Sequence, residues 1–247
     1  MTSQALDVNN PRGVNNDELV RCVDVARTFG SGSAAVVAVH GATCVVNAGD
    51  QIAITGPSGS GKSTLLHLLG GLERPTAGQI SWPGLGGDPT EHPGLVGTVF
   101  QAPSLLPPLD VRENVELPLH IRGNIEDVAG RAIAALRTLG IEDLAGKLPE
   151  ELSGGQAQRV AVARVLALGP LLILADEPTG QLDSAHAAIV MDALIGTAHR
   201  LGAALVVATH DQAVADRLPQ RWTVADGRLT ATHEQVADEP KERLSWR

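Results

Sequence analysis

The stretch QIAITGPSGSGKSTLLHLLGG, residues 51–71, predicts a strand, a glycine-rich loop and a helix in succession. Its first five residues read as a short apolar strand, and residues 62–69 have the apolar spacing of a helix that Gly70 and Gly71 end. Between them, GPSGSGKS matches the pattern G-x-x-x-x-G-K-[ST], whose glycines let successive backbone N–H groups wrap an anion at a helix N-terminus. The sequence therefore predicts a phosphate-binding loop formed by Gly56, Pro57, Ser58, Gly59, Ser60, Gly61, Lys62, Ser63 and Thr64.

Two side chains at the end of this loop have predicted tasks of their own. Lys62 is expected to reach the β and γ phosphates of a nucleotide, and the hydroxyl of Ser63 is expected to ligate Mg²⁺. A purely structural glycine turn is the alternative, but the preceding strand and the following helix both favour the phosphate-binding interpretation.

Two adjacent carboxylates, Asp176 and Glu177, end the apolar strand LLILAD at residues 171–176. Ligands of open α/β sheets bind at the carboxyl ends of the strands, so both acids are expected near the phosphate loop. Adjacent strand residues point to opposite sides, so the two acids have different tasks. We expect Asp176 in the Mg²⁺ shell and Glu177 as the general base that polarises an attacking water. Solvated acids at a strand end are the alternative.

Two further polar side chains follow apolar strands. His210 closes ALVVATH at residues 204–210, and Gln101 follows VGTVF at residues 96–100. A lone histidine is usually structural, but the convergence at one sheet edge predicts that His210 contacts the γ-phosphate and positions the water. Gln101 is the first residue of a predicted helical segment, and its amide can bind Mg²⁺ or water there.

A second glycine-rich turn, LSGGQ at residues 152–156, begins a helix that runs to Leu168. Ser153 and the N–H groups of Gly154 and Gly155 would form an anion site at the positive end of this helix. An ordinary N-cap by Ser153 is the alternative, and the two roles are compatible. The residues alone leave open whose phosphate this turn holds.

The pattern of elements predicts an α/β fold with one domain over residues 19–230. LVRCVDV (19–25) and AVVAVHGATCVVN (35–47) suggest a small antiparallel sheet, and apolar strands followed by helices indicate a parallel sheet covered on both faces. A helical insertion is expected at 101–166, which leaves a core of 19–100 and 167–230. Within the insertion, the proline-rich stretch 103–109 is expected to be irregular. Residues 1–18 are expected to form a flexible leader and 231–247 a charged tail.

Composition narrows the class of protein. The 247 residues carry a net charge of −9, which argues against a non-specific nucleic-acid binder, and the 2% aromatic content predicts an aliphatic core. Cys22 and Cys44 are expected to be buried thiols in a reducing compartment, with a redox pair as the alternative. No stretch approaches the roughly 18 apolar residues of a membrane span, and the N-terminus lacks an apolar signal core. These features indicate a cytoplasmic protein, which would serve a membrane through a partner.

Together, GPSGSGKS, Gln101, LSGGQ, LLILADEP, GQLD (180–183) and His210 resemble the nucleotide-binding subunit of ABC transporters over about residues 19–230. The resemblance implies a P-loop NTPase fold of the ABC ATPase type, with a mixed core sheet, a small antiparallel β subdomain and an inserted helical subdomain. It implies that the chain binds ATP and Mg²⁺ and hydrolyses ATP. It also places Phe29, where tyrosine is more usual, as the ring that stacks on adenine.

The same resemblance implies how the second turn works. Two subunits would pair head to tail as a homodimer, with Ser153, Gly154, Gly155 and Gln156 of each chain covering the γ-phosphate bound by the other chain's loop. Asp183 would be the key acid of a loop that communicates between the two sites.

Three longer stretches are similar to the lipoprotein-release and macrolide-export branch of the family: LLHLLGGLERPTAGQI, FQAPSLLPPLDVRENVELPLHIRG and LADEPTGQLDS. This implies a separate integral-membrane permease of the FtsX/MacB-like type, contacted through residues 103–121 and driven by mechanotransmission. It also implies that the chain is peripheral, on the cytoplasmic side of the cell membrane. The alternative for 103–121 is the core of the insertion itself. Ala157 and the short 83–95 connector depart from many relatives, which bears on partner fit.

Two functions follow from this resemblance. The first is export or extraction of a lipid-linked, peptide or hydrophobic substrate. The alternative is a regulatory ATPase that gates an extracytoplasmic cell-wall hydrolase without transport, and an importer is a third, less favoured possibility.

Overall fold

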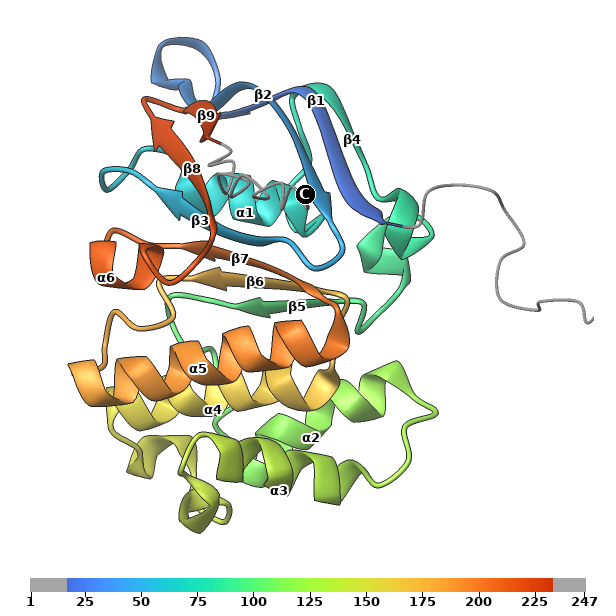
Figure 1. Cartoon of the computed structure of the whole chain (residues 1–247), viewed down its shortest axis with the longest axis vertical. Helices are drawn as coiled ribbons and strands as arrows, with labels where there is room; N and C mark the ends of the chain where they lie inside the picture. Colours follow the sequence, from blue (N-terminus) through green and yellow to red (C-terminus); the bar gives the residue numbers. More distant parts are fainter. Residues whose placement is uncertain (1–16, 233–247) are drawn as a thin grey trace, which may run out of the picture.

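The computed structural model describes residues 17–232 as two sheets and a set of helices arranged in layers (Figure 1). Most of the predicted leader (1–18) and tail (231–247) lies outside the described residues. The predicted boundaries differ slightly from those of the structure. Glu18, predicted to be in the leader, pairs with Asn47 in the first sheet, and Thr232, predicted to be in the tail, pairs with Arg221 in the last strand pair.

The smaller sheet is antiparallel, as the sequence predicts, and has the strand order β2-β1-β4. Its strands are β1 (Glu18–Phe29), β2 (Val36–Asn47) and β4 (Ala77–Ser81). β4 is not predicted by the sequence pattern, since AGQIS lacks the β-branched alternation of a strand. It forms because β1 offers a pairing edge, with Cys22 opposite Ile80.

The larger sheet, called the main sheet below, is mixed, and the predicted fold class is confirmed. Its order is β5-β6-β7-β3-β8-β9; the last pair is antiparallel and the other neighbours are parallel. The strands are β3 (Gln51–Thr55), β5 (Val96–Val99), β6 (Leu172–Asp176), β7 (Ala204–Ala208), β8 (Gln220–Ala225) and β9 (Arg228–Thr232). Because β3, β6 and β7 are parallel, their carboxyl ends meet at one edge of the sheet.

Helices cover both faces of the main sheet, as predicted. Helix α1 (Lys62–Leu69) lies between the two sheets, whereas α4 (Gly154–Leu168) and α5 (Ser184–Leu201) lie on the opposite face (Figure 1). Strand residues alternate accordingly: Leu172 and Leu174 pack in the cluster with α1, and Ile173 and Ala175 pack in the cluster with α4 and α5. Among the described residues, the cluster with α4 and α5 is aliphatic, as predicted, whereas the cluster with α1 also buries Trp82 and Trp222, so the prediction of an aliphatic core is wrong there.

Between β5 and β6 the chain is helical, and its two outer helices pack on α4. These are α2 (Val111–Arg122) and α3 (Val128–Thr138); the short helix α6 (Gln212–Ala215) follows β7. Asp127 caps α3 by accepting from the Gly130 N–H, and Gly140 follows its end at φ +64°. Short 3₁₀ helices occur at Gly32–Ala34, Pro83–Leu85, Pro89–Glu91, Glu142–Leu144 and Pro149–Glu151.

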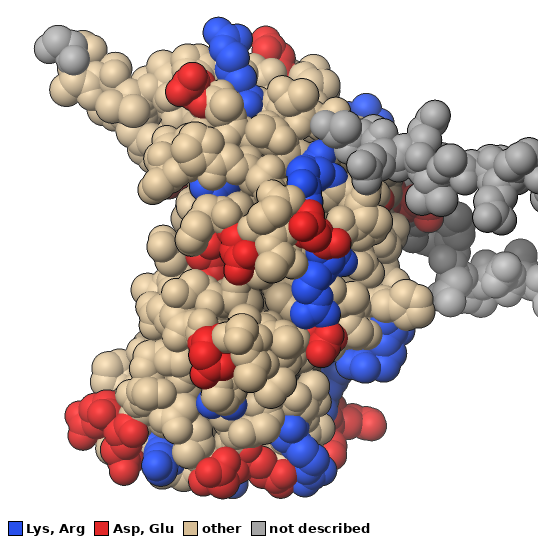
Figure 2. Space-filling model, turned by 60° about the vertical axis from the view of Figure 1, so that its left-hand side comes forward, with Lys and Arg blue, Asp and Glu red and all other residues tan. Residues whose placement is uncertain are grey.

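Cys22 and Cys44 are opposed partners on β1 and β2, and both are buried with free thiols, which confirms the predicted burial. A hydrogen bond with Cys22, together with burial, raises the pKa of the Cys44 thiol well above its usual range. On the face shown in Figure 2, basic side chains lie next to acidic ones. Within residues 17–232, no helix is long and apolar enough to cross a membrane.

Candidate functional site

The predicted phosphate loop connects β3 to α1 and is closed around the ammonium group of Lys62. Lys62 is buried, and its Nζ donates to the carbonyl oxygens of Gly56 at 2.9 Å and Pro57 at 3.0 Å. An ammonium group has three donors, so one remains for an incoming anion. The backbone at Gly61, the N-cap of α1, has φ +106°, which leaves the helix N-terminus open to a phosphate.

Two glycines of this loop are required by close backbone neighbours. A Cβ at Gly56 would lie 2.0 Å from the Val224 carbonyl oxygen, and one at Gly61 would lie 2.1 Å from that of Ala38. The loop is therefore pressed against β8 on one side and β2 on the other. A side chain at either position would force this packing apart.

The turn between β8 and β9 is hydrogen-bonded to the phosphate loop. Gly227 donates its N–H to the Ser60 carbonyl at 3.0 Å and accepts from the His40 N–H at 2.8 Å. The sequence patterns used above do not predict this hairpin. The available signal is Asp226-Gly227 between two alternating segments, since both residues have positive φ and form a tight hairpin turn.

Asp176 is the last residue of β6 and is nine-tenths buried or more, and its Oδ1 has no hydrogen-bond partner among residues 17–232. A buried carboxylate oxygen without a donor suits a divalent cation that prefers oxygen ligands. The hydroxyl of Ser63, in the first turn of α1, and the exposed amide of Gln101, two residues after β5, offer further oxygens near the carboxyl ends of the strands. These residues fit the Mg²⁺ ion expected from the sequence.

Glu177 leaves the strand direction of Asp176 because its backbone has φ +47°. Its N–H donates to the Ala208 carbonyl at 2.9 Å, which fixes it beside the end of β7. Its Oε1 lies 2.8 Å from His210 Nδ1 and accepts from the His210 N–H at 3.1 Å. The structure thus brings the predicted base and the predicted histidine into direct contact.

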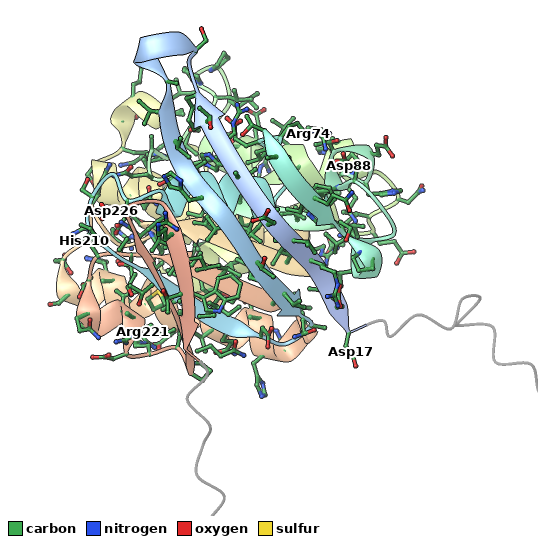
Figure 3. The ribbon with its side chains drawn as sticks, turned by 90° about the horizontal axis from the view of Figure 1, so that it is seen from above. Asp17, Arg74, Asp88, His210, Arg221 and Asp226 are labelled. Atoms are coloured by element: carbon green, nitrogen blue, oxygen red, sulfur yellow. The ribbon has the colours of Figure 1, made fainter. Side chains whose placement is uncertain are left out.

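The site lies at the edge where the parallel strands of the main sheet end. His210 follows β7 and the Asp226 turn follows β8, and Figure 3 shows both labelled residues at the same end of the molecule. The Glu177 side chain is 12% exposed and the His210 side chain 71% exposed. His210 can therefore meet a ligand from solvent while Glu177 is shielded behind it.

The second glycine-rich turn caps α4 through a reciprocal capping box. Ser153 Oγ accepts from the Gln156 N–H at 3.2 Å, and Gln156 Oε1 accepts from the Ser153 N–H at 2.9 Å. The turn lies against the loop after β6, since a Cβ at Gly154 would lie 2.7 Å from Gln181 Oε1. Because α4 and α1 lie on opposite faces of the main sheet, the turn is separated from the phosphate loop of its own chain (Figure 1).

Two remaining predicted residues lie outside this cluster. Phe29 ends β1 and is 38% exposed as a residue, with the Arg27 guanidinium 4.5 Å from the ring centroid. Asp183 caps α5, accepts from the His186 N–H at 2.9 Å and lies 2.6 Å from His186 Nδ1. These backbone and side-chain hydrogen bonds from His186 lower the pKa of the Asp183 carboxyl.

Comparison with protein families and curated proteins gives consistent matches. A family model described as ABC transporter matches residues 39–180. The lipoprotein-releasing system ATP-binding protein LolD of Legionella pneumophila (strain Paris) is 38% identical over 224 residues, which cover 87% of this chain and 99% of the relative. The protein of the same description from strain Lens matches with the same identity and coverage.

Solved structures match over the same part of the chain. The ATP-binding cassette MJ0796, in a dimeric post-hydrolysis state bound to ADP and Pi, superposes with a TM-score of 0.82 at 34% identity, covering 88% of this chain and 99% of that one. cbiO1 from Clostridium perfringens, part of the ABC transporter complex cbiONQ, gives a TM-score of 0.73 at 28% identity, covering 88% and 89%.

Proposed function

This chain belongs to the ABC transporter family and is an ATP-binding ATPase domain of it, and we propose that two copies close on two ATP molecules. This closure would drive a separate membrane permease. The observation that carries the proposal is the position of the two glycine-rich turns on opposite faces of the main sheet. A turn that is built for an anion but separated from its own phosphate loop suits a nucleotide held by a second copy.

Within each site, Glu177 and His210 supply the acid–base chemistry. Glu177 Oε1 is hydrogen-bonded to His210, whereas Oε2 accepts only from the Thr209 hydroxyl, at 3.4 Å, within the part of the chain that the structure describes. Oε2 is therefore the oxygen that accepts the proton of the attacking water. The exposed ring of His210 contacts the γ-phosphate and keeps the water in line.

The remaining charges of the site hold the phosphates. Lys62 donates its third proton to the β and γ phosphates, and the loop N–H groups at the start of α1 surround the β-phosphate. Asp176, Ser63 and Gln101 would hold Mg²⁺. That ion, when bound, neutralises the charge that develops on the phosphate oxygens.

The partner chain completes the site through the turn of α4. Its Ser153 hydroxyl, the N–H groups of Gly154 and Gly155, and Gln156 form the positive end of a 15-residue helix, which favours the γ-phosphate. Support comes from MJ0796, which is dimeric with ADP and Pi bound. Asp183, in the loop that touches this turn, transmits the state of one site to the other.

The permease would dock on residues 103–121, and the structure divides this segment in two. Val111, Val115 and Leu119 are fully buried and belong to the helical core, whereas Leu106 and Ile121 are exposed at 44% and 64%. Fully buried Asn114 donates to the carbonyls of Leu106, Leu109 and Asp110. The irregular loop is thereby fixed to α2 and can transmit force as a rigid part.

The proposed substrate class is supported by the names of the relatives. The proteins that match at 38% identity are ATP-binding proteins of lipoprotein-releasing systems. We infer that this chain energises extraction or export of a lipid-linked substrate through a permease of the same branch, from the cytoplasmic side of the membrane.

The proposal is tested by purifying tagged Glu177→Gln from membranes with ATP and Mg²⁺ and identifying what co-purifies. We expect an integral-membrane permease whose reconstitution with the wild-type chain gives ATP-dependent release of a lipid-linked protein from vesicles. A permease that instead activates a cell-wall hydrolase without moving substrate would favour the regulatory alternative. ATP hydrolysis with no membrane partner would contradict the transport proposal.

A further inference from the structure

The ring of Phe29 is held by a cation that comes from its own strand. Arg27 and Phe29 are two residues apart on β1, so their side chains leave the same face of the strand. The Arg27 guanidinium lies over the ring, 4.5 Å from its centroid. One face of the ring is thus covered, and Phe29 as a residue is 38% exposed.

The guanidinium is itself anchored from outside the strand. Arg27 Nη2 lies 2.7 Å from Glu73 Oε2, and the two side chains are 23% and 29% exposed. Glu73 belongs to the loop that follows α1, the helix whose N-terminus is the phosphate loop. The same loop is tied to β1 by Thr76, whose N–H donates to the Ala26 carbonyl at 2.8 Å and whose hydroxyl accepts from the Thr28 N–H at 3.2 Å.

These contacts leave Arg27 little freedom to turn away from the ring. A phenyl ring has no polar group with which to fix its own orientation, so a cation over one face is the contact that can hold its plane. A part-buried ion pair between Arg27 and Glu73 keeps that cation in place. The ring is therefore pre-oriented before any ligand stacks on it.

We propose that Arg27 is a positioning residue for the nucleotide base, forming a three-layer stack of guanidinium, phenyl ring and base, with Glu73 as its anchor. The inference rests on the proposed nucleotide site and adds two residues that no sequence motif marks. Removal of the cation frees the ring to rotate and weakens base stacking, while the phosphate contacts of the loop stay as they are.

The test compares a ligand that has a base with one that lacks it. The dissociation constants of ATP and of inorganic tripolyphosphate are measured by calorimetry on the full-length chain, its Arg27→Met variant and the matched control Arg21→Met, which removes an exposed arginine of the same strand paired with Glu18. We expect Arg27→Met to weaken ATP binding about two- to fivefold. Tripolyphosphate binding stays at the wild-type value, and Arg21→Met changes neither.

A double-mutant cycle separates this role from general support of the fold. In a Phe29→Ala background, Arg27→Met should not change the dissociation constant of ATP any further. In the otherwise wild-type chain, Glu73→Gln should weaken ATP binding, as Arg27→Met does. The inference is overturned if Arg27→Met binds ATP like the wild type, binds it more tightly because the arginine occupies the place of the base, or loses ATP and tripolyphosphate equally. Failure of the wild-type chain to bind ATP would instead contradict the proposed function.

Discussion

Glu177 and His210 share one oxygen: the backbone N–H of His210 donates to Glu177 Oε1 at 3.1 Å, and His210 Nδ1 lies 2.8 Å from the same atom. The two residues follow neighbouring strands, β6 and β7, at the edge where the phosphate loop also lies. The contact fixes the direction of the carboxylate, and among the described residues its other oxygen, Oε2, accepts only a long hydrogen bond from the Thr209 hydroxyl, at 3.4 Å.

Glu177→Gln should keep nucleotide binding and lose turnover. An amide has the shape of the carboxylate but cannot accept the proton of water, so we expect the rate of phosphate release to fall about 10²- to 10⁴-fold. The dissociation constant for ATP should stay within a factor of about two. Phosphate release and calorimetry on the same preparation measure both quantities, and near-normal hydrolysis by this variant would show that Glu177 is not the base.

The phosphate loop and its strands could be predicted because their signals are local. Residues 51–71 contain the strand, the glycines and the helix within one continuous stretch, and the apolar strands before Asp176 and His210 are equally self-contained. β4 could not be predicted, because AGQIS becomes a strand only by pairing with β1, more than fifty residues earlier. The Arg27–Glu73 ion pair could not be predicted from the sequence for the same reason.

The site was predicted in outline and not in its contacts. Parallel strand order places Asp176, Glu177 and His210 at one edge, which the sequence indicates. The sequence does not indicate that the positive φ of Glu177 brings its carboxylate to the His210 N–H, or that the Gly227 N–H donates to the Ser60 carbonyl. Such contacts depend on the register of strands that are distant in sequence.

Gly227→Ala should weaken nucleotide binding through the phosphate loop. A Cβ there would lie 2.7 Å from His40 Cδ2 and 3.0 Å from the Ala38 carbonyl oxygen, on a backbone with φ +71°. Displacement of this turn moves the carbonyl of Ser60, so we expect ATP affinity to fall about tenfold and stability to fall by about 1–2 kcal/mol.

The matched control is Gly49→Ala, at a turn glycine with φ +79° and open space around the added atom. Gly49→Ala should lower the stability of the protein, because alanine is strained at positive φ, and it should leave the ATP affinity unchanged. Equal ATP affinity in the two variants would show that the turn does not support the loop.

Asp88 should make the stability of the fold depend on acid pH. Hydrogen bonds from the Thr90 hydroxyl and N–H, together with Arg74, lower the pKa of its carboxyl to about 2 (Figure 3). A folded-state pKa below the unfolded value stabilises the protein above the unfolded pKa, and the effect is lost as pH falls toward the folded one.

Asp88→Asn should therefore melt at a lower temperature than the wild type near neutral pH. The difference should shrink as pH falls from about 4 to about 2. Thermal melts of both proteins across this range measure it, and a difference independent of pH would rule out the ionised carboxylate as its source.

In the proposed dimer, the LSGGQ turn of one copy completes the nucleotide site of the other. The direct measurement is the mass in solution, by light scattering, of Glu177→Gln with saturating ATP and Mg²⁺, alone and combined with Ser153→Arg. We predict a dimer for Glu177→Gln and a monomer for the combined variant, which still binds ATP because its own phosphate loop is intact. A Glu177→Gln chain that binds ATP and stays monomeric, or a Ser153→Arg chain that no longer binds ATP as a monomer, would contradict the account.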